Sequence, residues 1–71
     1  MPRLPRLTAK QAISILEKRG FKLVRQSGSH KIFRNSDHKR TTVPFHANKI
    51  LHPKILASIL KDAEIKPDEL N

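Results

Sequence analysis

The chain has 71 residues, no cysteine and a formal net charge of +9 at neutral pH. A chain of this length forms one small domain and buries only roughly 60% of the surface that it exposes when unfolded. The lack of cysteine excludes disulfides and thiolate metal sites. No apolar stretch has the length of a membrane span or the form of a signal peptide. We therefore expect one cytoplasmic globular domain over residues 1–71.

The positive charge is concentrated in the first part of the chain. Residues 1–40 contain eleven Lys or Arg against two acidic residues, whereas residues 41–71 contain four of each. Charge that is segregated in this way is typical of proteins that bind polyanions. It favours a nucleic-acid partner over a generically soluble surface. A membrane surface is disfavoured because no helix would combine an apolar face with a wholly basic one.

The first predicted elements are an extended arm and a helix. Two prolines within residues 1–7 argue against a helix there. Thr8 and Gln11 have the spacing of a capping box, in which each side chain accepts from a free backbone N–H. Apolar residues then recur at helical spacing, and Gly20 suits a left-handed helix end. We expect a helix over residues 8–19.

The hydrophobic period then changes from helical to alternating, which predicts strands. Short connections between the strands imply an antiparallel meander. Pro44 indicates an edge position or a strand end. The predicted strands cover residues 21–26, 30–34 and 41–45, with turns at 27–29 and 35–38.

A final helix is expected from Pro53, which suits a first helical turn. Its predicted apolar face is Ile55, Leu56, Ile59, Leu60 and Ala63. Residues 64–71 are expected to form a tail with a short turn. The order α-β-β-β-α predicts an α+β fold, a two-layer sandwich with both helices on one face of the sheet. Double-stranded-RNA-binding domains have the same order. The other sheet face would be open and would carry the basic strand residues, namely Lys22, Arg25, Lys31 and Arg34.

Three short motifs carry a more specific resemblance. Gly28-Ser29-His30 is followed by Phe33, then by Val43-Pro44-Phe45-His46, and last by Ile59-Leu60-Lys61-Asp62-Ala63. In this order and over nearly the whole chain, they resemble the HicA family of toxin mRNA interferases. The resemblance implies a metal-independent endoribonuclease without a cofactor, in which His30 is catalytic and a HicB-type antitoxin is the inhibitory partner. The chain departs from the family after the last helix, where Glu64 stands in place of a frequent glycine.

The same residues suit RNA cleavage on chemical grounds. RNA carries its own nucleophile, the 2′-hydroxyl, so a base near neutral pKa and positive charge at the phosphate suffice. His30 supplies the imidazole. The candidate substrate-binding residues are Lys22, Arg25, Gly28, Ser29, Lys31, Arg34 and His46. No compact group of Asp and Glu is available for a two-metal mechanism.

Several alternatives stay open at this point. If Phe33 enters the core, His30 faces the open surface, whereas if Ile32 enters, His30 lies at the core rim; a bulge at the Gly28 turn would reconcile both. His30 could also be a structural turn residue, and His46 could simply orient its loop. The four histidines are eight, eight and six positions apart, which is not the spacing of a zinc site.

The competing function is a non-catalytic double-stranded-RNA-binding module of the same topology. Such a module would bind RNA without needing His30. A DNA-binding protein is disfavoured because strands separate the two helices, which leaves no helix-turn-helix pair.

Overall fold

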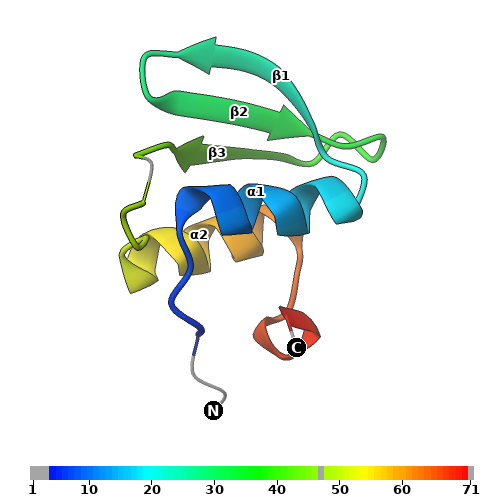
Figure 1. Cartoon of the computed structure of the whole chain (residues 1–71). Helices are drawn as coiled ribbons and strands as arrows, with labels where there is room; N and C mark the ends of the chain where they lie inside the picture. The colour runs from blue at the N-terminus through cyan, green and yellow to red at the C-terminus, as the bar shows by residue number, and fades with distance from the viewer. Residues whose placement is uncertain (1–3, 47, 71) are drawn as a thin grey trace.

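The computed structural model describes residues 4–46 and 48–70 and has the predicted order α-β-β-β-α. A short 3-10 helix, η1, follows the last α-helix (Figure 1). The sheet is antiparallel with strand order β1-β2-β3. The elements are α1 Ala9–Lys18, β1 Lys22–Ser27, β2 His30–Arg34, β3 Arg40–Pro44, α2 Pro53–Ala63 and η1 Pro67–Leu70. The α+β prediction is confirmed, while the likeness to double-stranded-RNA-binding domains rests on element order alone.

Helix α1 begins and ends as its sequence predicts. The Thr8 hydroxyl accepts from the Gln11 backbone N–H at 3.2 Å, and the Gln11 side-chain oxygen accepts from the Thr8 N–H at 2.9 Å. This capping box satisfies two donors that the first helical turn leaves free. At the other end Gly20 has φ +86°, and the Phe21 N–H returns to the Leu16 carbonyl at 3.0 Å. The chain therefore turns sharply from α1 into β1.

A two-residue turn, Gly28-Ser29, joins β1 to β2. Gly28 has φ +57°, a conformation that glycine adopts without strain and that a type II′ hairpin turn needs at this position. The sheet contains a bulge, but it lies in β1 between Leu23 and Arg25 rather than at the Gly28 turn. The extra residue, Val24, gives β1 a local shift in register against β2.

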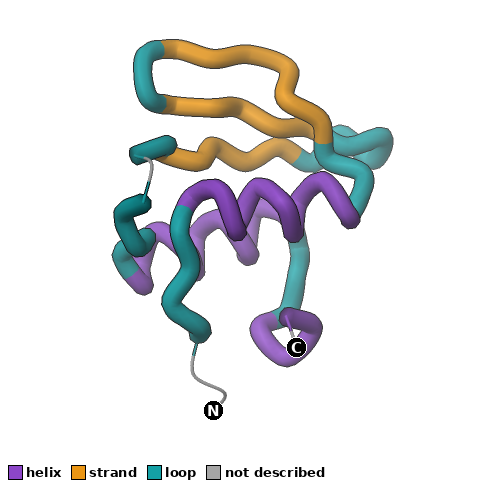
Figure 2. The backbone as a smooth tube through the Cα atoms, in the orientation of Figure 1, coloured by secondary structure: helices purple, strands orange, loops and turns teal. Residues whose placement is uncertain are grey.

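The two helices lie on one side of the sheet, nearest β3, and β1 is the strand farthest from them (Figure 1, Figure 2). Phe33 of β2 and Val43 of β3 point into this layer and are 2% and 0% exposed. Every residue of β1 is exposed. The buried apolar residues are Ala9, Ala12, Leu16, Phe21, Phe33, Val43, Leu51, Leu56, Ile59, Leu60, Ala63 and Ile65.

The predicted apolar face of α2 is confirmed except at Ile55, which is 39% exposed. Pro53 is the first helical residue, and His52 caps the helix by accepting the Lys54 N–H on Nδ1 at 3.1 Å. At the C-terminal end Glu64 has φ 56° and ψ 40°. This left-handed conformation costs a non-glycine residue about 1 kcal/mol or more. An ion pair between Glu64 and Lys39 accompanies the strained residue.

The described residues before α1 and after α2 pack against the helical layer, while residues 1–3 of the predicted arm lie outside the described residues. Leu4, Leu7 and Leu70 are partly buried against the core, and the Leu51 N–H donates to the Leu7 carbonyl at 2.7 Å. The η1 turn is tied to α1, since Glu69 lies 3.5 Å from the Arg19 guanidinium. Within the described part of the chain, no helix has the length and apolar character needed to cross a membrane.

Thr41 of β3 is a polar residue inside the core, and its replacement should stabilise the protein. Its side chain is 2% exposed, and among the described residues its hydroxyl finds no hydrogen-bond partner. An unsatisfied buried hydroxyl costs about 1–3 kcal/mol. Thr41→Val, which keeps the shape, should raise the free energy of unfolding by about 1–2 kcal/mol. Urea denaturation measures this change.

The neighbouring Thr42 provides the matched control, because it is exposed on the other face of the same strand. Thr42→Val should change stability by no more than about 0.5 kcal/mol. A loss of stability in Thr41→Val would mean that the hydroxyl has a partner in solution.

Candidate functional site

The sheet face that the helices leave open carries three rows of residues. Residues paired across antiparallel strands project to the same side, so the strand register determines which side chains are neighbours. Phe33 points to the helices, and its strand neighbours therefore point to the open face. The rows are Ser27–His30–Pro44, Arg25–Ile32–Thr42 and Lys22–Arg34–Arg40.

His30 begins β2 directly after the hairpin turn and lies on the open face. This resolves the alternative that the sequence left open, because Phe33 rather than Ile32 enters the core. The backbone beside His30 is held on both sides. The Phe45 N–H donates to the Ser29 carbonyl at 2.6 Å, and the Gln26 side-chain amide donates to the Gly28 carbonyl at 3.1 Å. An exposed imidazole on a fixed backbone is suited to meet a ligand.

On the open face Ser27 and Pro44 lie directly opposite His30 on the two neighbouring strands, and Arg25 lies on the diagonal. Diagonal neighbours in a sheet are about 7–8 Å apart at the backbone, which the long arginine side chain can span. The three strands contain no Asp or Glu. The open face therefore combines a titratable imidazole with uncompensated positive charge, an arrangement that favours a phosphate ligand.

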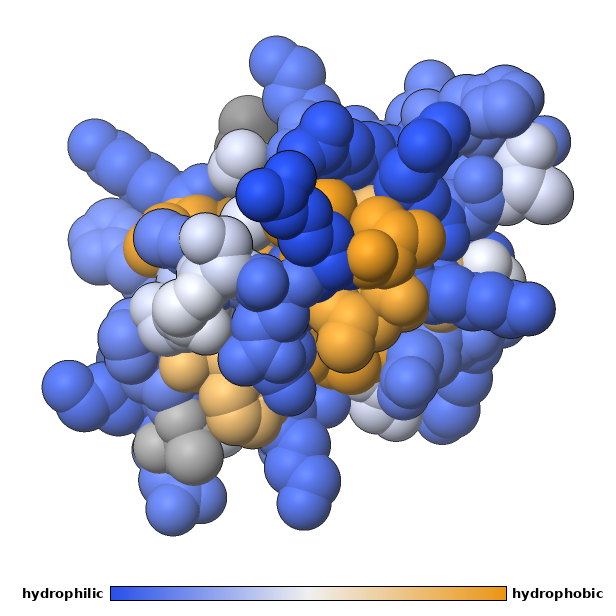
Figure 3. All heavy atoms as spheres, turned by 90° about the horizontal axis from the view of Figure 1, so that it is seen from above, coloured by the Kyte–Doolittle hydropathy of each residue, from blue (hydrophilic) through white to orange (hydrophobic). Residues whose placement is uncertain are grey.

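The β1 side of the molecule also has an apolar component. Leu23 and Val24 are 49% and 54% exposed there. Figure 3, which views the molecule from the β1 side, shows hydrophobic atoms bordered by hydrophilic side chains. A ligand lying across this strand would meet apolar and basic groups together.

The expectation that Lys31 shares the open face with Lys22, Arg25 and Arg34 is wrong. Lys31 alternates with His30 along β2 and points to the helix side, as Phe33 does. Its ammonium lies 3.9 Å from the centre of the Phe45 ring, a cation–π contact. It lines a hollow of about 590 Å³ beside α1. Lys31 is therefore separated from His30 by the sheet.

Phe45 differs in burial from the other two phenylalanines of the chain. Phe21 and Phe33 are buried, but Phe45 is only partly buried and packs at the core margin. The side chain of Lys31 covers one face of its ring. Phe45 therefore lies at the edge of the helical layer, with one face of its ring covered by Lys31.

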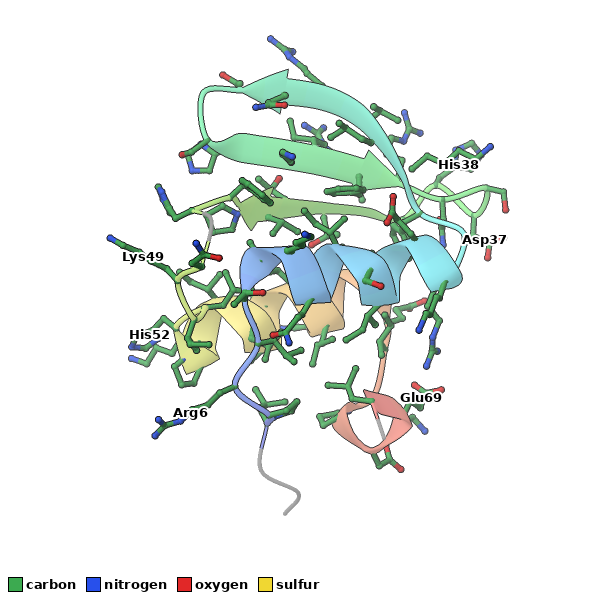
Figure 4. The ribbon with its side chains drawn as sticks, viewed as in Figure 1. Arg6, Asp37, His38, Lys49, His52 and Glu69 are labelled. Atoms are coloured by element: carbon green, nitrogen blue, oxygen red, sulfur yellow. The ribbon has the colours of Figure 1, made fainter. Side chains whose placement is uncertain are left out.

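The other histidines have different surroundings. His46 follows β3, two residues after Pro44, which is the cross-strand partner of His30, and it lines a small hollow with Pro44 and Lys49. His52 caps α2, and His38 lies in the predicted turn after β2. Figure 4 shows His38 at the opposite side of the molecule from Lys49 and His52. Among residues 4–46 and 48–70, no group of potential ligands is arranged to hold a metal ion.

Two open-face residues were absent from the sequence-based candidates. Arg40 pairs directly with Arg34, and Ser27 pairs directly with His30. The third strand was predicted to begin at Thr41, one residue late, which left Arg40 outside the predicted strand. Counting across the turn between Arg34 and Arg40 would have found that pair. Ser27 was assigned to the turn, although it ends β1.

Comparison with known families agrees with the motif pattern. The model of the family described as "HicA toxin of bacterial toxin-antitoxin" matches residues 9–65. No curated protein matches the chain significantly. The matched region begins at the first residue of α1 and ends just after α2, so it includes both helices and the entire sheet. By this match over most of its length, the chain belongs to the HicA toxin family.

Proposed function

We propose that the chain is a metal-independent endoribonuclease that cleaves mRNA and is inhibited by a HicB-type antitoxin. Its family makes it a toxin of a toxin–antitoxin system and implies an antitoxin partner. The observation that carries the enzymatic proposal is the placement of His30, which is exposed on a basic sheet face whose strands contain no acid. The imidazole there can act on a bound phosphodiester, and the strands offer no carboxylate that would repel the phosphate.

The proposed reaction is an internal transfer at phosphorus. His30 takes the proton of the RNA 2′-hydroxyl, the 2′-oxygen forms a bond to the adjacent phosphorus, and the bond from phosphorus to the 5′-oxygen breaks. The leaving 5′-oxygen takes a proton from His46 or from water. The products carry a 2′,3′-cyclic phosphate and a 5′-hydroxyl. General base catalysis by a histidine supplies about 10²–10⁴-fold of such a rate enhancement.

Arg25 is the cation best placed to support this step, because it is the diagonal neighbour of His30 on the open face. Negative charge develops on the non-bridging oxygens as the 2′-oxygen attacks, and a guanidinium within reach stabilises it. Gly28 and Ser29 position His30 through their backbone and keep the approach to it narrow. Lys31 can meet RNA only from the α1 side of the sheet.

The antitoxin is proposed to cover the open face. That face carries cations from all three strands, so an inhibitor with acidic side chains would be attracted to it and would block His30. The same surface would then serve RNA and antitoxin in turn. Competition between them is the expected form of inhibition.

The proposal is tested by incubating the chain with an end-labelled single-stranded RNA in excess EDTA. We expect cleavage that yields 2′,3′-cyclic phosphate ends. A matched oligonucleotide with a single 2′-deoxy nucleotide at the cleaved position should be resistant there, because it lacks the nucleophile. Gel electrophoresis before and after mild acid, which opens cyclic phosphates, identifies the ends.

Cleavage of the 2′-deoxy substrate, or a requirement for a divalent metal ion, would contradict the proposed mechanism. Binding of both oligonucleotides without cleavage of either would instead indicate the non-catalytic RNA-binding module of the same topology.

A further inference from the structure

Three basic residues lie directly opposite one another across the open face. Lys22 pairs with Arg34, and Arg34 pairs with Arg40, so the three form one cross-strand row. All three side chains are exposed. Facing residues in a sheet have Cβ atoms about 4.5–5.5 Å apart, and like charges in such positions destabilise the sheet. The row therefore weakens the protein unless an anion lies over it.

No acidic side chain in the described part of the chain neutralises this row. The ion pairs found among residues 4–46 and 48–70 are Arg19–Glu69 and Lys39–Glu64, and neither includes a member of the row. Asp37 lies in the turn after β2 but does not line the hollow at the row. The positive charge of the row is left for a ligand.

The row has a concave surface beside it. Lys22 and Arg34 line a hollow of about 420 Å³ together with His38 and Val24. The Arg34 Nη2 lies 3.2 Å from His38 Nδ1. Since a guanidinium can only donate, His38 accepts on this nitrogen, and the contact restrains the orientation of Arg34. A restrained guanidinium loses less entropy when it binds an oxyanion.

The row and His30 lie at opposite ends of β2. Arg34 is four positions after His30 along β2, which corresponds to about 13 Å at roughly 3.3 Å per residue. A single phosphate cannot touch both places. A continuous strand of RNA can, since Ile32 and Thr42 lie between them on the same face without opposing charge.

We infer that the row Lys22–Arg34–Arg40 anchors a backbone phosphate of the RNA strand that flanks the bond cleaved at His30. The inference rests on the proposed ribonuclease function and assigns a second, non-catalytic subsite to the same face. Contacts to phosphates fix the register of a nucleic acid without reading its sequence. The row therefore determines affinity and position, while the chemistry takes place at His30.

The test removes the row and measures binding apart from cleavage. The variant Lys22→Gln/Arg34→Gln/Arg40→Gln is made in the wild type and in a His30→Ala background. The control is Lys18→Gln/Lys54→Gln/Lys61→Gln, which removes the same charge from exposed positions on α1 and α2. Binding of a labelled single-stranded RNA to the His30→Ala proteins is titrated at several salt concentrations, and KM and kcat are measured in the active background.

We expect the row variant to bind RNA more weakly and to have a flatter dependence of log affinity on log salt. The slope should fall by about 0.7 for each phosphate contact removed. In the active background KM should rise while kcat stays close to wild type. The helix variant should keep the steeper slope. The melting temperature of the row variant should equal or exceed that of wild type, because the variant removes like-charge repulsion. Weaker RNA binding by this variant then cannot be ascribed to unfolding.

Equal losses of RNA affinity in the two triple variants would overturn the inference, since such losses would reflect net charge alone. So would a fall in kcat at unchanged KM. If the row variant cuts RNA normally but escapes the cognate antitoxin, the row belongs to the protein partner and the RNA assignment fails. If wild type never cleaves RNA but the row still determines the salt slope, the proposed nuclease fails while the anchoring site stands.

Discussion

Replacing His30 by alanine is expected to slow RNA cleavage by about 10²–10⁴-fold, the range that a general base contributes. RNA affinity should stay close to that of wild type, because the basic residues of the open face are untouched. The protein should remain folded, since His30 is exposed and its loss should change stability by no more than about 0.5 kcal/mol. Single-turnover cleavage in EDTA, with binding measured in parallel, separates the chemical step from affinity.

The control for this substitution is His52→Asn. It removes an imidazole from the same small protein, but asparagine keeps the capping of α2 because its side chain also accepts from the first helical turn. His52→Asn should cleave RNA as wild type does. Full activity in His30→Ala would refute the catalytic role of His30. A loss of RNA binding that matches the loss of cleavage would make His30 a binding residue.

The helices could be predicted well because their ends carry local signals. Thr8, Gln11 and Gly20 form the cap and the termination of α1, and Pro53 marks the start of α2. These signals act over a few residues and do not depend on the rest of the fold. Short turns between alternating segments likewise predicted the antiparallel sheet.

The faces of the strands were harder to predict. Alternation alone allowed either Phe33 or Ile32 to enter the core, and the choice depends on packing against α1 and α2. The bulge at Val24 could not be predicted, because neither glycine nor proline lies at that position in β1. Lys31 was placed on the open face although alternation along β2 gives it the facing of Phe33, and Arg40 was omitted because the third strand was predicted to begin one residue late. The catalytic role of His30 was predicted from the resemblance to a family. The chemistry of the surrounding residues is consistent with that role but would not have identified it alone.

The proposed function also depends on which face of β2 enters the core. Substitutions at Phe33 and Ile32 test this orientation. Phe33 is 2% exposed beneath both helices, so Phe33→Ala should lower the free energy of unfolding by about 3–5 kcal/mol. The total free energy of unfolding of a small domain is about 5–15 kcal/mol, so this loss is a large fraction of it. Phe33→Leu keeps most of the apolar bulk and should cost about 1–2 kcal/mol, which leaves a folded protein to measure.

Ile32→Ala is the matched comparison, because Ile32 is the next residue on the same strand and faces the open side. It should cost about 1 kcal/mol, since its side chain is only partly buried and little apolar area is lost. Urea denaturation of the variants shows directly which substitution costs more stability. If Ile32→Ala proved the more costly change, β2 would face the other way. His30 would then lie at the rim of the core, Lys31 would take its place on the open face, and the case for an exposed catalytic imidazole would be lost.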